Sequence, residues 1–268
     1  MRVSGAKILI TGASSGIGAA LAPILAERGA TVGIVARRED RLREVLAACR
    51  KHTPESRMWV ADLGDLDRAE QVALEAWEAF GGLDALVNNA AIPKRTHVAQ
   101  LTPDDVEHVM NVDFHSPMRM SLAVLPRMLE RASGTILFVS STGGRIPIPN
   151  ESAYNAAKFA MCGFAEAMAV DLAGTGVAVK LVLPGPIETE IWDQPDNEAT
   201  LFDIEKVPAA ECAAGIADAL TDDGFEYYIP PIFPGGVDAK ELVVGKTQSC
   251  DDYIRGMGDF AKILRESS

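Results

Sequence analysis

The sequence predicts an α/β fold: a single doubly wound domain whose seven-stranded parallel sheet carries helices on both faces. Three observations support this prediction. Short β-branched runs alternate with longer amphipathic segments, as they do in repeated βα units. The segments between these runs are long enough for right-handed crossovers. No Ser/Gly-rich linker or change in composition divides the 268 residues, and 48% of them are hydrophobic, which is enough for one large core.

The first predicted strand contains the run Ala6-Lys-Ile-Leu-Ile10, and strands and helices alternate from there onward. Pro23 falls within the first helix and removes a backbone donor, which predicts a kink. In such a sheet ligands bind beyond the carboxyl ends of the strands, so functional residues are expected there. The expected strands are 6–11, 31–36, 57–61, 84–88, 135–140, 177–183 and 226–229. The expected helices are 16–28, 39–51, 66–80, 103–131, 152–174 and 208–221.

The loop after the first strand is rich in glycine. It lies between a predicted strand and a predicted helix, where backbone N–H groups can face a phosphate. Gly12 permits the turn, Gly16 lets the backbone approach a pyrophosphate, and Gly18 lets the helix pack closely on the sheet. An ordinary glycine-rich turn is the alternative. The predicted dinucleotide-binding residues of this loop are Gly12, Ser14, Ser15, Gly16, Ile17 and Gly18.

Two arginines follow the second strand. Ala36 stands where a carboxylate would bind a free ribose 2′-hydroxyl, and Arg37 and Arg38 come next. Guanidinium groups bind a 2′-phosphate through charge-assisted hydrogen bonds. We therefore predict that NADP(H) is the preferred cofactor and that NAD(H) remains possible. The alternative is that the two arginines merely begin a solvated helix.

Tyr154 and Lys158 lie four residues apart in a predicted helix, which places them on one face. A phenol has a pKa of about 10, and a nearby ammonium stabilises the phenolate and lowers that pKa. Such a pair can exchange a proton with a carbonyl oxygen while a nicotinamide exchanges a hydride with the carbon. Ser141 ends the fifth strand, where its hydroxyl can orient the carbonyl, and Ser140 is expected to face the opposite side. By itself such a pair is more often an ordinary pair on the surface of a helix.

Together these motifs resemble the short-chain dehydrogenase/reductase family of the Tyr-x-x-x-Lys type. They occur in the family's order over residues 6 to about 190. Ala91 stands in place of a glycine of the family's pattern. The resemblance implies a Rossmann-type fold. It rests on Thr-Gly-x-x-x-Gly-x-Gly, Asn88-Asn-Ala-Ala91, Asn111, Ser141, Tyr154, Lys158 and Pro184-Gly-Pro-Ile-Glu-Thr189.

The resemblance also implies roles for individual residues. Lys158 would bind the nicotinamide ribose, and Asn111 would bend its helix and help to hold a proton-relay water. The Ile187 backbone and the Thr189 hydroxyl would be available to the nicotinamide carboxamide. The implied catalytic residues are Asn111, Ser141, Tyr154 and Lys158. Beyond the glycine loop and the two arginines, the implied cofactor-binding residues are Asp62, Leu63, Asn89, Ala90, Ala91, Tyr154, Lys158, Pro184, Gly185, Ile187 and Thr189.

Two segments are expected to shape the substrate site. A substrate lid is expected at about 188–207, and its apolar residues favour an apolar substrate, although they are equally compatible with packing of a resting loop. A C-terminal extension at about 235–268 departs from the family's short ending and is individual to this chain. A helical stripe there suits docking on its own subunit or on a partner, although Gly256 and Gly258 weaken the helix. The residues concerned are Trp192, Leu201, Phe202 and Ile204 in the lid, and Tyr253, Met257, Phe260 and Leu264 in the stripe.

Composition limits the partners. The formal charge of −13 disfavours nucleic acid and anionic membranes. The four cysteines are scattered, and His108 and His115 share a helical face with Asn111 without further ligands, so no metal is expected. Without a secretion signal or an apolar run of about 18 residues, we expect a cytoplasmic protein. The helix at 152–174 is apolar on every face, which predicts a homodimer or homotetramer through it.

The leading interpretation is an NADP(H)-dependent oxidoreductase that interconverts a ketone or aldehyde and the corresponding alcohol on an apolar substrate. Two alternatives remain. The chain could be a catalytically silent NADP(H)-binding sensor, which the presence of every motif residue disfavours. It could also be an epimerase or lyase that uses the cofactor transiently.

Overall fold

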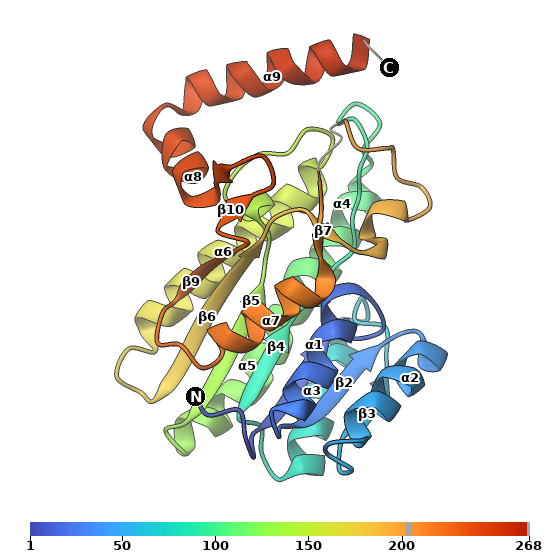
Figure 1. Ribbon diagram of the computed structural model, residues 1–268, viewed down its shortest axis with the longest axis vertical. Coiled ribbons are helices and arrows are strands. Elements are labelled where there is room, and N and C mark those ends of the chain that lie inside the picture. Colours follow the sequence, from blue (N-terminus) through green and yellow to red (C-terminus); the bar gives the residue numbers. More distant parts are fainter. Residues whose placement is uncertain (202–204, 267–268) are drawn as a thin grey trace.

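The chain folds around one large sheet, seen in Figure 1, a computed structural model that describes residues 1–201 and 205–266. The strand order is β3-β2-β1-β4-β5-β6-β9, and every neighbouring pair is parallel. This confirms the predicted α/β class and the seven-stranded sheet. The strands are β1 (Lys7–Thr11), β2 (Thr31–Ala36), β3 (Arg57–Val60), β4 (Ala85–Asn88), β5 (Gly134–Val139), β6 (Val177–Pro184) and β9 (Glu226–Ile229).

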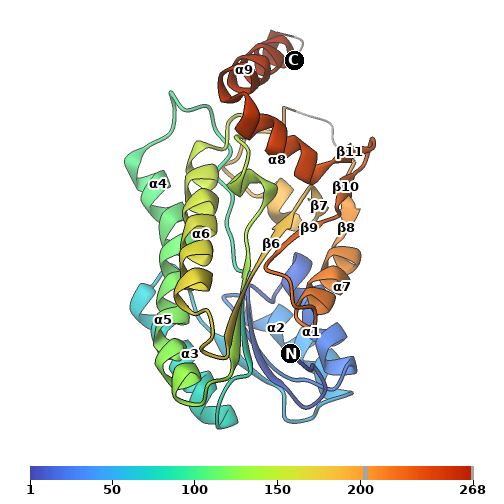
Figure 2. The same cartoon turned by 90° about the vertical axis from the view of Figure 1, so that its left-hand side faces the viewer.

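Helices cover both faces of the sheet, as Figure 2 shows. Successive side chains of a strand point to opposite faces, so Ile8 and Ile10 of β1 pack into one apolar layer while Leu9 packs into the other. Burial on both faces explains why the strands read as nearly continuous apolar runs. The first layer contains α1 (Gly16–Glu27), α2 (Glu39–Arg50) and α7 (Ala209–Ala219), and the second contains α3 (Leu66–Phe80), α5 (Ser116–Glu130) and α6 (Ser152–Asp171).

The helix expected at 103–131 is divided by a π-helical turn. The first part is α4 (Pro103–Met110), the turn is Asn111–His115, and α5 follows. In the turn the Ser116 N–H donates to the Asn111 carbonyl, five residues back. The next residue, Pro117, has no N–H, so the regular α-helical ladder cannot run unbroken through this point. By contrast, α1 continues through Pro23 to Glu27.

The strand order reverses beside β1, because β2 lies on one side of it and β4 on the other. The loops that leave the carboxyl ends of β1 and β4 therefore diverge to opposite faces of the sheet. This is the position at which open parallel sheets form a ligand-binding crevice. The glycine loop follows β1, and Asn89 follows β4.

A group of smaller elements lies beyond the carboxyl ends of the strands, where Figures 1 and 2 show α8 and α9 as the outermost parts of the chain. Gly256 and Gly258 do not interrupt α9. We expected these glycines to weaken the helix, yet it runs unbroken from Cys250 to Glu266. The elements are β7 (Ile187–Glu188) paired with β8 (Val207–Pro208), β10 (Ile232–Phe233) paired with β11 (Val237–Asp238), α8 (Ala239–Gln248) and α9 (Cys250–Glu266).

Candidate active site

The glycine loop forms a close cradle at the carboxyl end of β1. Gly12 and Gly16 adopt φ angles of 68° and 53°, which are unfavourable for residues that carry a β-carbon. A β-carbon on Gly12 would lie 2.7 Å from the Ala90 Cα, and one on Gly16 would lie 2.9 Å from a methyl carbon of Thr189. The loop therefore has no room for side chains where it faces β4 and β7. This backbone cradle fits the pyrophosphate of a dinucleotide.

Gly18 has a different environment from the other two glycines. A β-carbon there would lie 2.6 Å from the Gly12 carbonyl and 2.6 Å from the Asn89 side-chain nitrogen. It does not line the cavity described below. Its place agrees with the predicted role in close packing of the helix, although cofactor contact by Gly18 stays a prediction.

Thr11 and Asn89 join the ends of β1 and β4. The Asn89 Nδ2 donates to the Thr11 carbonyl at 2.9 Å, and the Thr11 Oγ1 accepts from the backbone N–H groups of Asn89 (2.8 Å) and Ala90 (2.9 Å). Sequence reasoning did not assign a role to Thr11. Its position directly before the first glycine of the motif was the only available signal.

One cavity of about 790 Å³ extends from the glycine loop to the C-terminal helices. It brings together residues from the carboxyl ends of six strands, β1 to β6, which are widely separated in the sequence. Of the predicted site residues, it is lined by Gly12, Ser14, Ser15, Gly16, Ile17, Arg37, Arg38, Asp62, Leu63, Asn89, Ala90, Ala91, Ser141, Tyr154, Lys158, Pro184, Gly185, Ile187 and Thr189.

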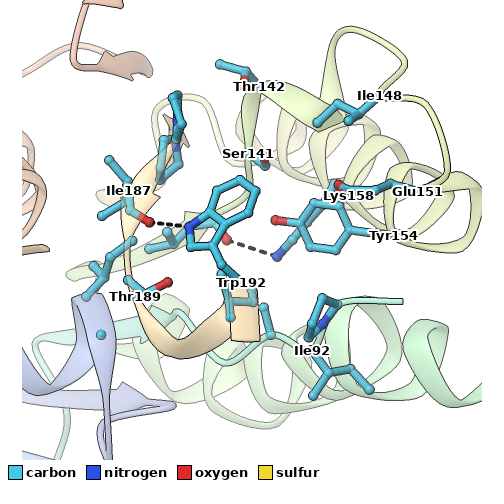
Figure 3. Close-up of a pocket in the computed structure, with 18 of the residues that line it drawn as sticks. Ile92, Ser141, Thr142, Ile148, Glu151, Tyr154, Lys158, Ile187, Thr189 and Trp192 are labelled. Atoms are coloured by element: carbon cyan, nitrogen blue, oxygen red, sulfur yellow. Dashed lines mark hydrogen bonds between the residues drawn. The ribbon is translucent and has the colours of Figure 1, made fainter. Parts of the chain in front are cut away.

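Ser141, Tyr154 and Lys158 lie together on the wall of this cavity, as Figure 3 shows. Ser141 follows β5, and its Oγ accepts from the Gly143 N–H at 3.0 Å. Ser140 points toward α6, where its hydroxyl donates to the Lys158 carbonyl at 3.2 Å. Both serines line the cavity, and the choice of Ser141 over Ser140 as the catalytic residue stays a prediction. Residues 154 and 158 occupy successive turns of α6, and the Lys158 Nζ lies 5.4 Å from the centre of the Tyr154 ring.

The ammonium of Lys158 is directed toward the buried carboxylate of Asp113. The Lys158 Nζ lies 3.4 Å from the Asp113 Oδ2 and donates to the Val139 carbonyl at 3.4 Å. The Asp113 Oδ1 accepts from the Ile92 N–H at 2.8 Å. Burial raises the pKa of Asp113 to about 6, although the Lys158 charge opposes the rise. Sequence reasoning missed Asp113, and an acid within the apolar helix segment was the only signal for it.

The expected lowering of the Tyr154 pKa is wrong for this arrangement. Burial raises the pKa of the phenol above its ordinary value, and the negative charges of Asp113 and Glu151 add to the rise. A hydrogen bond with Ser141 opposes it. Lys158 is not among the main influences on this pKa, and its ammonium lies beside the Asp113 carboxylate.

Asn111 does not join the residues that line the cavity. It is the first residue of the π-helical turn, so the expected local deviation of the helix is present at Asn111. Its neighbour Val112 lines the cavity instead. A role of Asn111 in catalysis stays a prediction.

The segment expected as a lid is held by a buried ion pair that sequence reasoning missed. Arg95 and Glu151 lie 2.9 Å apart, and their side chains are 4% and 11% exposed. The Arg95 guanidinium also donates to the Glu198 carbonyl at 3.1 Å and lies 5.3 Å from the centre of the Trp192 ring. One basic and one acidic residue that lie 56 positions apart form no local pattern, so the sequence did not indicate this contact.

Trp192 is hydrogen-bonded to Ile187 of β7, as Figure 3 shows. Its indole N–H donates to the Ile187 carbonyl at 2.6 Å. The Ile187 carbonyl has a second lone pair, and contact of the Ile187 backbone with the nicotinamide carboxamide stays a prediction. Trp192 and Leu201 line the cavity. Phe202 and Ile204, the other apolar residues of the predicted lid, lie outside the described residues.

The two predicted cofactor arginines differ in their surroundings. Arg37 is exposed, and its Nη1 lies 3.9 Å from the Asp62 Oδ2, so the ends of β2 and β3 approach one another. Arg38 instead crosses to the glycine loop, where it donates to the hydroxyl groups of Ser14 and Ser15. The alternative that both arginines only begin a solvated helix does not describe Arg38.

The C-terminal elements close the far end of the cavity. Tyr253, Met257 and Phe260 of the predicted stripe line it together with Phe233 and Leu242. The stripe thus docks on its own chain, which is one of the two arrangements expected from the sequence. The Arg265 guanidinium adds a hydrogen bond of 2.8 Å to the Asn150 side chain. The predicted C-terminal extension therefore contributes an apolar wall.

Neither a cluster of metal-ligating side chains nor a membrane-spanning helix occurs among the described residues. In residues 1–201 and 205–266, no three His, Cys, Asp or Glu side chains gather closely enough to hold a metal ion. None of the helices in that part of the chain has the length and apolar character needed to cross a bilayer.

Comparisons with known proteins agree with this geometry. Over residues 6–199 the sequence matches the family described as short chain dehydrogenase. A curated relative, a short chain dehydrogenase of Pseudocercospora fijiensis, is 33% identical over 193 residues. These residues are 71% of this chain and 62% of that protein, so the chain spans less than two thirds of that relative.

Solved structures of similar proteins extend the likeness to the fold. A short-chain dehydrogenase from Streptomyces avermitilis has a TM-score of 0.80 at 27% identity and covers 99% of this chain and 100% of its own. We expected the C-terminal extension to be individual to this chain. That expectation is wrong, because the likeness to this structure includes the extension. A short-chain dehydrogenase/reductase from Burkholderia phymatum in complex with NAD has a TM-score of 0.78 at 25% identity, covering 86% of this chain and 91% of its own.

A further structure, a short-chain dehydrogenase from Sphingobium yanoikuyae in complex with NADPH, has a TM-score of 0.78 at 27% identity and covers 91% of this chain and 94% of its own. The sequence match includes the glycine loop, Ser141, Tyr154 and Lys158, and the structural likeness includes the sheet that brings them together. On both grounds, the chain belongs to the short-chain dehydrogenase family of oxidoreductases.

Proposed function

We propose that this protein is an NADP(H)-dependent oxidoreductase that interconverts a ketone or aldehyde and the corresponding alcohol. One observation carries the proposal: Ser141, Tyr154 and Lys158 line the same cavity as the glycine loop and the two arginines. Proton-transfer groups and a dinucleotide cradle that share a cavity suit a reaction between a bound cofactor and a small molecule.

In this proposal each residue has a distinct chemical task. The nicotinamide cofactor would supply or accept the hydride. The Tyr154 hydroxyl donates a proton to the substrate oxygen in reduction and takes it back in alcohol oxidation. The Ser141 hydroxyl donates a hydrogen bond to the same oxygen as negative charge develops on it. Lys158 would bind the nicotinamide ribose, and Asn111 would help to relay protons.

The preference for NADP(H) rests on the charges at the end of β2. Arg37 and Arg38 line the cavity, while Ala36 provides no carboxylate for a 2′-hydroxyl. One related structure is in complex with NAD and the other with NADPH, so the fold by itself does not decide between the two cofactors. Asp62, Leu63 and the segment 89–91 are proposed to hold the adenine half and the adjoining part of the cofactor.

The proposed substrate is apolar. The cavity is also lined by Ile92, Ile148, Trp192 and Met257, which offer contact area without charge. We propose that 188–207 acts as the substrate lid within one domain of 268 residues, and that the C-terminal extension completes the binding chamber.

We also propose that the protein forms a homodimer or homotetramer through α6. This helix buries one face against the sheet and leaves another exposed, and the exposed face is unusually apolar. Apolar surface of this kind is typical of an interface between subunits. Its exposed residues include Ala156, Phe159, Gly163, Ala167 and Val170.

The direct test is a panel of ketones, aldehydes and secondary alcohols, followed by nicotinamide absorbance with both cofactors at matched concentrations. We expect turnover of apolar carbonyl compounds with a higher kcat/KM for NADPH than for NADH. NADPH binding without turnover of any compound would favour the sensor. Product formation without net NADPH consumption would favour an epimerase or lyase.

A further inference from the structure

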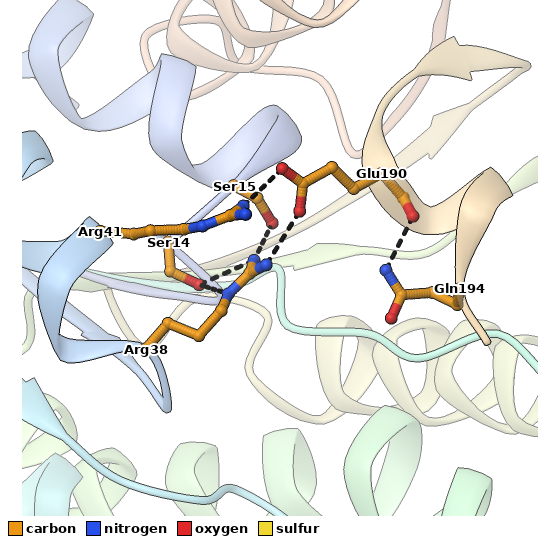
Figure 4. Close-up of polar contacts among 6 residues, drawn as sticks. All are labelled: Ser14, Ser15, Arg38, Arg41, Glu190 and Gln194. Atoms are coloured by element: carbon orange, nitrogen blue, oxygen red, sulfur yellow. Dashed lines mark hydrogen bonds and ion pairs between the residues drawn. The ribbon is translucent and has the colours of Figure 1, made fainter.

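Arg38 is the centre of a polar cluster at the mouth of the cavity, drawn in Figure 4. Its Nε and Nη2 donate to the Ser14 Oγ at 3.2 Å each, and Nη2 also donates to the Ser15 Oγ at 2.5 Å. On its other side, Nη1 donates to the Glu190 Oε2 at 2.8 Å. One guanidinium thus connects the glycine loop to the segment that follows Thr189.

Glu190 is held by two cations. Arg41, one turn further along α2, donates to its second carboxylate oxygen, Oε1. The backbone of Glu190 is anchored separately, because its carbonyl accepts from the Gln194 side chain at 2.8 Å. The carboxylate can therefore leave the arginines by side-chain rotation while its backbone stays in place.

The position of this carboxylate matters because it lies where a cofactor phosphate is expected. Ser14, Ser15, Arg38 and Glu190 all line the cavity. The side chains of Arg38 and Glu190 are 39% and 47% exposed, so solvent and ligands can reach the pair. A carboxylate and a phosphate are both anions that pair with a guanidinium fork, and they repel each other at short distance.

We propose that Glu190 is a specificity-determining residue, an internal carboxylate that competes with the 2′-phosphate of NADP(H) for Arg38. The inference rests on the proposed function, in which Arg38 binds that phosphate. When the 2′-phosphate arrives, the Glu190 side chain must release the Nη1 of Arg38 or remain beside a second anion. Either outcome weakens the binding of a 2′-phosphate and leaves a 2′-hydroxyl unaffected.

The consequence is a smaller preference for NADP(H) than Arg38 would give without Glu190. Exposed ion pairs contribute modestly and are screened by salt. Removing the Glu190 charge should therefore tighten binding of a 2′-phosphate by about 3- to 5-fold at low ionic strength. The gain should shrink as salt is added.

The experiment measures binding by calorimetry with two probes that differ only in this group, adenosine 2′,5′-bisphosphate and adenosine 5′-monophosphate. In Glu190→Gln we expect the bisphosphate to bind about 3- to 5-fold more tightly and the monophosphate to bind as before. Glu188→Gln is the matched control. It removes the same charge two residues before Glu190, and the Glu188 side chain forms no ion pair with Arg38. It should leave the ratio of the two affinities unchanged.

Arg38→Ala separates this inference from the proposed function. We expect it to abolish the preference for the bisphosphate. If that preference survives unchanged, Arg38 is not the phosphate site and the role of Glu190 is overturned, while the proposed preference for NADP(H) then rests on Arg37. If the parent protein binds the two probes equally tightly, the proposed cofactor preference itself is overturned. If Arg38→Ala abolishes the preference but Glu190→Gln leaves bisphosphate affinity unchanged or weakens it, only the competition by Glu190 is overturned.

Discussion

The Nζ of Lys158 lies 3.4 Å from the Oδ2 of Asp113, and both side chains are buried, at 1% and 0% exposure. The lysine of the Tyr-x-x-x-Lys motif therefore has a carboxylate partner beneath the cavity floor. Paired in this way, the ammonium is held in position next to Tyr154, while the Asp113 carboxylate raises the pKa of the phenol. We propose that Asp113 is a positioning residue that holds Lys158 and whose charge also acts on Tyr154.

Asp113→Asn should move the pH dependence of alcohol oxidation to lower pH. A carboxylate near the phenol disfavours the phenolate and raises the pKa of Tyr154, so its removal lowers that pKa. In alcohol oxidation Tyr154 must be deprotonated, so the acidic limb of the kcat/KM profile should shift down by about one pH unit. Because the pKa of Asp113 is about 6, the two enzymes should differ above that pH and converge below it. An unchanged profile, or one moved to higher pH, would contradict the role of Asp113.

Tyr154→Phe should lower kcat at least about 100-fold, because it removes the proton donor and keeps the ring. Binding of NADPH, followed by fluorescence, should change little. Tyr228→Phe is the matched control, since its hydroxyl bonds to Glu226 and its ring does not line the cavity. Near-normal turnover in the Tyr154 variant would exclude the proposed proton transfer.

Arg95→Met should loosen the segment that carries Trp192. We expect a higher KM for the substrate with a smaller change in kcat, and a change in Trp192 fluorescence. The free energy of unfolding should fall by about 3 kcal/mol, because the buried Glu151 loses its partner.

The stability loss in Arg95→Met should grow with pH. Burial already raises the pKa of Glu151, and without Arg95 that pKa rises further, so the folded state holds its proton to a higher pH than the unfolded state does. Stability therefore falls as pH increases through this range. Arg95→Met with Glu151→Leu should recover stability and leave KM high. If the double variant recovered the parent KM as well as the parent stability, the ion pair would not position the segment that carries Trp192.

Met257→Glu should discriminate against bulky apolar substrates. Met257 lines the far end of the cavity on α9, so a charge there must be desolvated when a long substrate binds. We expect kcat/KM to fall about 10-fold for the largest apolar substrates and to change little for small ones. Ile254→Glu, on a half-exposed residue of the same helix that does not line the cavity, is the control. Equal effects of the two substitutions would argue against α9 as a substrate wall.

Val170→Glu should dissociate the proposed oligomer. Val170 is 75% exposed on the apolar face of α6, and a charge at a subunit interface would be buried without a partner. Light scattering at micromolar concentration should give a smaller mass than for the parent protein. Val98→Glu, on an exposed residue outside α6, should keep the parent mass. A parent protein that is monomeric at this concentration would count against the interface.

The features that depend on local sequence were predicted well. Apolar runs, crossover lengths and the glycine spacing depend on neighbouring residues, and they were enough for the α/β class, the seven strands and the family. The spacing of Tyr154 and Lys158 follows from the helical repeat, so their shared face was predictable. The π-helical turn at Asn111–His115 was not, because a pattern of apolar positions does not distinguish it from a continuous helix.

Tertiary structure decided the contacts that adjust the site. Arg38 and Glu190 are 152 positions apart, and Arg95 and Glu151 are 56 positions apart, so no local pattern pairs them. The raised pKa of Tyr154 required knowledge of its burial and of Asp113, because desolvation depends on everything packed around a group. The sequence by itself determined the chemical groups and their strand ends. Only the folded chain determined which charges meet, because the carboxyl ends of a parallel sheet gather residues from distant parts of the sequence.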